Sequence, residues 1–106
     1  MFGVIGSGSW ATALVKILTD NGNVVNWWIR NEKSIEHIQR RHHNPSYLHS
    51  VNFDVSLLSM SANIDEVIKN SDILVIAVPS AYIEESIGHL QLQDWEGKKI
   101  VSAVKG

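Results

Sequence analysis

The chain of 106 residues is 44% apolar, and its nine basic and eleven acidic side chains give a formal charge of −2 at neutral pH. This length and composition predict one packed domain, and the charge offers no broad positive surface for nucleic acid or for an anionic membrane. The sequence has no cysteine, which excludes disulfides and thiolate metal sites, and it has no apolar run of the ~20 residues that would cross a bilayer. We therefore expect a cytoplasmic protein without a signal peptide.

Short apolar segments alternate with helix-patterned segments along the chain. Buried strands are predicted over Phe2–Ile5, Val24–Ile29, Val55–Met60, Ile73–Val78 and Ile100–Val104. Helices are predicted over Ala11–Leu18, Glu32–Arg41, Ile64–Ile68 and Tyr82–Leu90. Strands that are apolar throughout and alternate with helices are typical of a parallel sheet covered on both faces, and right-handed crossovers give a doubly wound order of 3-2-1-4-5.

The turn between the first strand and the first helix has a glycine pattern. Residues 6–11 read Gly-Ser-Gly-Ser-Trp-Ala, which is the G-x-G-x-x-A spacing of dinucleotide-binding turns. The first glycine allows the tight bend, the second lets a pyrophosphate lie against the backbone, and the first amides of the helix face that anion. A purely structural turn is the alternative. Cofactor contacts are expected at Gly6, Ser7, Gly8, Ser9 and Trp10.

The second strand ends in Arg30, where many such folds have a carboxylate that accepts hydrogen bonds from the ribose 2′-hydroxyl. A guanidinium can instead pair with a 2′-phosphate, so NADP is admitted beside NAD, with a lean toward NADP. The alternative is a solvated arginine at the end of the strand. Trp27 and Trp28, just before it, should point to opposite faces of the strand and pack in the core.

The carboxyl edge of the sheet is where open α/β folds bind ligands, and two later segments end there. The fourth predicted strand ends at Val78 and Pro79, so the chain should turn there beside the nicotinamide half of the cofactor. Lys105 follows the fifth strand. Metal binding by His37, His42, His43 and His49 is not expected, because their spacing matches no known site.

Several motifs together resemble one family, the bacterial NAD(P)-dependent glycerol-3-phosphate dehydrogenases. They are residues 6–14 (GSGSWATAL), 28–30 (WIR), 44–48 (NPSYL), 77–80 (AVPS) and 101–106 (VSAVKG). The resemblance implies that residues 1–106 form an incomplete N-terminal NAD(P)-binding Rossmann domain, truncated before the helical substrate domain. After Leu48 the chain departs from the family, which usually has proline there, so the resemblance does not determine the geometry of that loop.

The resemblance also implies an activity, the interconversion of dihydroxyacetone phosphate and sn-glycerol 3-phosphate by hydride transfer with NAD(P)H, which supplies glycerophospholipid synthesis. It implies that Lys105 faces the substrate and the cofactor, and that the full-length enzyme is a homodimer. The chain alone is expected to be inactive. Two alternatives stay open at this point: a related reductase, of the ketopantoate reductase or hydroxy-acid dehydrogenase type, and a nucleotide-binding module without chemistry.

Overall fold

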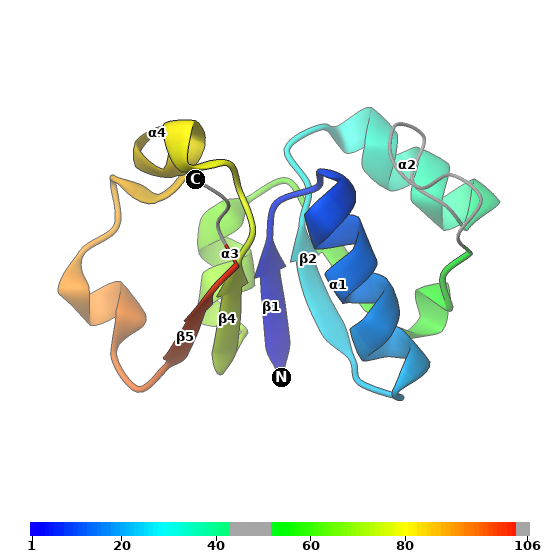
Figure 1. Cartoon of the computed structure of the whole chain (residues 1–106), viewed down its shortest axis with the longest axis horizontal. Coiled ribbons are helices and arrows are strands. Elements are labelled where there is room, and N and C mark those ends of the chain that lie inside the picture. The colour runs from blue at the N-terminus through cyan, green and yellow to red at the C-terminus, as the bar shows by residue number, and fades with distance from the viewer. Residues whose placement is uncertain (43–51, 104–106) are drawn as a thin grey trace.

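The computed structural model describes residues 1–42 and 52–103, and its centre is a five-stranded parallel sheet (Figure 1). The strands are β1 (Phe2–Ile5), β2 (Val25–Trp28), β3 (Leu58–Ser61), β4 (Ile73–Ile76) and β5 (Lys99–Ser102). Their order is β3-β2-β1-β4-β5, and each neighbouring pair is parallel. The predicted doubly wound order is therefore confirmed.

In the described residues, four α-helices and three short 3₁₀ turns connect the strands. The helices are α1 (Ser9–Asp20), α2 (Glu32–Arg41), α3 (Ile64–Lys69) and α4 (Ile83–Ile87), and the turns are η1 (Val55–Leu57), η2 (Ser80–Tyr82) and η3 (Leu92–Trp95). Helices α1 and α2 pack on one face of the sheet, while α3 and α4 pack on the other. Adjacent tryptophans of β2 divide between the two cores, because Trp27 belongs to the first and Trp28 to the second, as alternation along a strand requires.

The strands predicted over Val24–Ile29 and Ile73–Val78 are each two residues shorter in the structure, and two other elements differ for identifiable local reasons. The strand predicted over Val55–Met60 begins only at Leu58, because Asp54 caps a 3₁₀ turn by accepting a hydrogen bond from the amide of Ser56. The helix predicted over Tyr82–Leu90 is confined to Ile83–Ile87, since glycine follows at position 88 and disfavours continuation.

The fifth strand, predicted to be buried, is exposed along its whole length. Ile100 and Val101 are 50% and 49% exposed. The physical reason is position, because within the described residues β5 is an edge strand that pairs with β4 alone. The apolar sequence predicted that a strand forms here, observed over Lys99–Ser102, but it could not distinguish an edge strand from a central one.

Candidate functional site

The site lies where β1 and β4 end side by side in the sheet. From β1 the chain turns into α1 on one face, and from β4 it continues into α4 on the other face. The connections that follow these two parallel strands therefore leave toward opposite faces of the sheet, and such a position is called a topological switch point. Ligands of open α/β folds bind in the crevice at such a point, outside the carboxyl ends of the strands.

The two glycines of the turn have different physical roles. Gly6 has a φ of +129°, and a Cβ placed on it would lie 2.7 Å from the carbonyl oxygen of Ala77 at the end of β4. No other residue fits there without strain. Gly8 has an ordinary φ of −72°, and apart from its two chain neighbours no described residue has an atom within 4 Å of a Cβ built on it. Gly6 is therefore required by the fold, whereas Gly8 leaves open space at the start of α1.

Hydrogen bonds hold the turn in place from neighbouring elements. The indole Nε1 of Trp27 donates to the carbonyl oxygen of Gly6 at 2.6 Å, and the hydroxyl of Thr12 donates to the carbonyl oxygen of Gly8 at 2.7 Å. Gly8 is also the N-cap of α1, and as a glycine it has no side chain of its own with which to cap that helix end. The amino-terminal end of α1, which carries the positive end of the helix dipole, lies beside the open space at Gly8.

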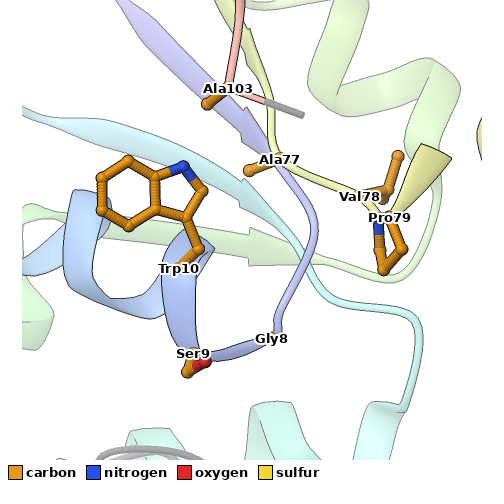
Figure 2. Close-up of a pocket in the computed structure, with 7 residues that line it drawn as sticks. All are labelled: Gly8, Ser9, Trp10, Ala77, Val78, Pro79 and Ala103. Atoms are coloured by element: carbon orange, nitrogen blue, oxygen red, sulfur yellow. The ribbon is translucent and has the colours of Figure 1, made fainter. Parts of the chain in front are cut away.

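A pocket of about 260 Å³ opens beside this turn (Figure 2). It is lined by Gly8, Ser9, Trp10, Ala77, Val78, Pro79 and Ala103. Figure 2 shows the Trp10 indole extending from the start of α1 toward Ala77 and Ala103, at the ends of β4 and β5. Apart from the backbone of the turn, the walls are mainly apolar, as is usual for sites that enclose a flat organic ring.

A second hollow lies on the other side of the turn and has charged walls. It is lined by Ser7, Arg30, Asn31, Glu32, Lys33 and Ala62. Asn31 caps α2 by accepting a hydrogen bond from the amide of Lys33. Arg30 is 70% exposed, and its guanidinium pairs with the carboxylate of Glu85 on α4 at 2.8 Å. This hollow, beside the end of β2, is where such folds accommodate the adenosine ribose.

Two described carboxyl groups outside the site have clearly displaced pKa values. Hydrogen bonds from the hydroxyl and then the amide of Ser56 lower the pKa of Asp54 below its ordinary value of 3.8. A hydrogen bond from the N-terminal amine lowers the pKa of Asp72 in the same way. Within residues 1–42 and 52–103 no cluster of three histidine or acidic side chains is arranged to hold a metal ion. In the same ranges no helix combines the length and apolarity that crossing a membrane requires.

The structure brings most of the residues expected at the site together. Gly8, Ser9, Trp10, Val78 and Pro79 line the apolar pocket, and Ser7 and Arg30 line the charged hollow, with Gly6 buried between them. Lys105 and the segment 44–48 lie outside the described residues.

The sequence did not indicate that three further residues, Trp27, Thr12 and Glu85, form hydrogen bonds with residues of the site. Thr12 follows the motif directly, but the bond from its hydroxyl to Gly8 depends on the helix that forms there. Trp27 is 21 residues from Gly6 in the sequence, and Glu85 is 55 residues from Arg30. No local sequence pattern reveals contacts over such separations.

Comparison with known proteins agrees with this geometry. The family model described as the N-terminus of NAD-dependent glycerol-3-phosphate dehydrogenase matches residues 2–106. The glycerol-3-phosphate dehydrogenase (NAD(P)+) of Agathobacter rectalis is 38% identical over 104 residues, which are 98% of this chain and 31% of that protein. That of Staphylococcus carnosus is 36% identical over 103 residues, again 31% of its length. The chain thus spans about a third of the curated relatives it matches.

Solved structures give the same result. Glycerol-3-phosphate dehydrogenase from Saccharomyces cerevisiae superposes with a TM-score of 0.87 at 25% identity, over 99% of this chain and 33% of that one. The enzyme from Plasmodium falciparum superposes with a TM-score of 0.80 at 28% identity, over 95% of this chain and 31% of that one. An imine reductase from Myxococcus stipitatus has the same fold, with a TM-score of 0.71 at 18% identity.

Proposed function

The chain belongs to the family of N-terminal, NAD(P)-binding domains of glycerol-3-phosphate dehydrogenase, and on that premise we propose that it serves the interconversion of dihydroxyacetone phosphate and sn-glycerol 3-phosphate. In this proposal the chain binds NAD(P)H, whose nicotinamide supplies or accepts the hydride. The rest of a longer enzyme completes the substrate site, since the matched relatives are about three times as long. The product would enter glycerophospholipid synthesis in the cytoplasm.

The observation that supports cofactor binding most directly is the open space beside Gly8 at the start of α1, where the positive end of the helix dipole lies. A pyrophosphate beside Gly8 would accept hydrogen bonds from the first amides of α1 and would meet the positive end of its dipole. The hydrogen bond from Trp27 to Gly6 holds the turn in the required shape before any ligand arrives. Binding therefore needs little reorganisation of the chain.

The two hollows on either side of the turn suggest how the cofactor is oriented. The apolar walls formed by Trp10, Val78 and Pro79 suit the nicotinamide half, where they would exclude water from the reacting ring. The hollow beside Arg30 and Lys33 suits the adenosine half, and both cations favour a 2′-phosphate. We therefore propose binding of both cofactors with a lean toward NADPH.

Lys105 is proposed to contact the substrate phosphate or carbonyl, and the cofactor beside it, from the segment that follows β5. A cation at this edge would stabilise the phosphate charge or the charge that develops on the carbonyl oxygen. The phosphorylated substrate would be the small-molecule partner, the longer enzyme would be a homodimer, and neither nucleic acid nor membrane would be bound.

Calorimetric titration of the purified chain with NADH and NADPH tests the proposed cofactor site. Saturable binding of either dinucleotide is expected, without oxidation of NAD(P)H when dihydroxyacetone phosphate is added, because the substrate domain is needed to orient the reaction. A longer form of the protein, which includes the substrate domain, should oxidise NAD(P)H when dihydroxyacetone phosphate is added. Absence of binding at millimolar cofactor would overturn the proposed site, and turnover of ketopantoate but not dihydroxyacetone phosphate by the longer form would overturn the proposed substrate.

A further inference from the structure

The ion pair between Arg30 and Glu85 spans the carboxyl edge of the sheet. Arg30 follows β2, whereas Glu85 lies on α4, which follows β4. Because β1 lies between these two strands, the pair links the two sides of the strand that leads into the glycine turn. Figure 1 shows α2, which begins just after Arg30, and α4 on opposite sides of the upper end of β1.

The pair acts on the residue that would recognise a 2′-phosphate. The Nη2 atom of Arg30 lies 2.8 Å from the carboxylate of Glu85, and Arg30 also lines the charged hollow beside Ser7. A phosphate ester in that hollow would have to share the guanidinium with Glu85 or displace it. It would also approach the negative charge of Glu85, and like charges at this range repel.

The two side chains are 70% and 56% exposed, so their attraction is screened and can be overcome by a doubly charged phosphate. Competition from Glu85 therefore weakens the contact between Arg30 and a 2′-phosphate without abolishing it. A cofactor with a free 2′-hydroxyl is neutral at that position and loses nothing to Glu85. The effect of Glu85 is thus selective for one of the two cofactors.

We propose that Glu85 is a specificity-determining residue that, by holding the guanidinium of Arg30, reduces affinity for NADPH and brings it closer to the affinity for NADH. This inference rests on the proposed cofactor site. It assigns to α4 a part in cofactor choice, acting through Arg30 rather than by contact with the cofactor. Without Glu85, Arg30 would give a stronger preference for NADPH over NADH than it does in the ion pair.

The test is to measure dissociation constants for NADPH and NADH calorimetrically at low ionic strength, for the unaltered chain and for Glu85→Gln. Release of Arg30 should tighten NADPH binding about threefold or more, the scale of a lost exposed ion pair plus relieved repulsion, and should leave NADH within twofold. The gain should shrink in 0.5 M salt, since salt screens both terms.

Glu84→Gln is the matched control, because it removes the same charge from the neighbouring position of α4, for which the described contacts include no pair with Arg30. In an Arg30→Gln background the effect of Glu85→Gln should be clearly smaller, because only the direct repulsion of the phosphate then remains to be relieved. If both cofactors bind and their ratio does not move, or if Glu84→Gln moves it equally, the role of Glu85 is wrong while the site stands. If neither cofactor binds, the proposed site itself fails, and this inference with it.

Discussion

The indole Nε1 of Trp27 donates a hydrogen bond of 2.6 Å to the carbonyl oxygen of Gly6, which joins the apolar core to the glycine turn. Trp27 is fully buried on β2, and its ring packs against that of Phe53 with centroids 5.4 Å apart. Its orientation is therefore fixed by packing on one side and by the turn on the other. The core of the domain sets the shape of the turn independently of any ligand.

Replacing Trp27 by phenylalanine should weaken both folding and cofactor binding. The variant keeps an aromatic ring but leaves the buried carbonyl of Gly6 without its donor, which typically costs about 1–3 kcal/mol of unfolding free energy. The turn also loses its anchor, so NAD(P)H affinity should fall severalfold. Denaturant unfolding and calorimetry measure the two effects separately.

Trp95→Phe is a suitable control, since Trp95 packs on the opposite core, away from the turn. It should cost stability without changing cofactor affinity. If Trp27→Phe lowered stability but left affinity unchanged, the hydrogen bond to Gly6 would be a feature of the core alone.

Opposite outcomes are expected for the two glycines of the turn. Gly6→Ala should destabilise the fold by about 1–3 kcal/mol, because a φ of +129° is strained for alanine and the new Cβ would meet the Ala77 carbonyl. Gly8→Val should cost about 1 kcal/mol or less, since its backbone is ordinary and the space is open. The valine would fill that space, and NAD(P)H binding should be lost.

Gly22→Ala controls for a general loss of stability, because its φ of +81° disfavours alanine at the far end of α1. This variant should lose stability comparable to Gly8→Val but retain the cofactor. Unchanged NAD(P)H affinity in a folded Gly8→Val protein would place the pyrophosphate elsewhere.

The sheet could be predicted from the sequence because each strand is a short apolar run, and a parallel order follows from alternation with helices. The predicted bounds failed where local chemistry competes with the apolar pattern. Asp54 capped a 3₁₀ turn inside an apolar run, and Gly88 cut short a helix whose apolar spacing continued. The exposure of Ile100 depends on which other elements pack against β5, and the residues of the strand alone do not determine this.

The site was predictable to the extent that it is local. The glycine spacing and the strand end predicted that Gly8, Trp10 and Val78 lie at one edge of the sheet, and the three residues line the same pocket. The partners of Gly6 and Arg30 were not predictable, because Trp27 and Glu85 approach them only after the sheet has formed. Long-range hydrogen bonds of this kind leave no periodic signal in a single sequence.

Stability near Asp54 should depend on pH through Ser56. Because hydrogen bonds from Ser56 lower the folded pKa of Asp54 below 3.8, they stabilise the fold above that pH, and this contribution is lost as pH falls through the lowered pKa. Ser56→Ala should therefore lower the melting temperature at pH 6 and make less difference at more acidic pH. Ser59→Ala, an exposed change on β3, should show no such pH dependence.

Lys105 should be needed for turnover in a longer form of the enzyme. Lys105→Ala is expected to lower kcat/KM for dihydroxyacetone phosphate about 10²-fold or more, the scale of one lost charge-assisted contact in a closed site. Lys99→Ala at the start of β5, the opposite end of the same strand, should have little effect. A change below about threefold for Lys105→Ala would make it a solvated surface residue.

Arg30→Asp should reverse the cofactor preference. The arginine offers a 2′-phosphate a charge-assisted contact worth roughly 1.5–3 kcal/mol before desolvation, whereas an aspartate repels the phosphate and accepts hydrogen bonds from a ribose 2′-hydroxyl. The replacement also places a second carboxylate opposite Glu85, which adds to the repulsion. The ratio of NADPH to NADH affinity should therefore fall at least tenfold, while Arg40→Asp, the same charge change on the exposed side of α2, should leave it unchanged. A ratio that responds equally to both variants would mean that net charge, and not the position of Arg30, decides the choice.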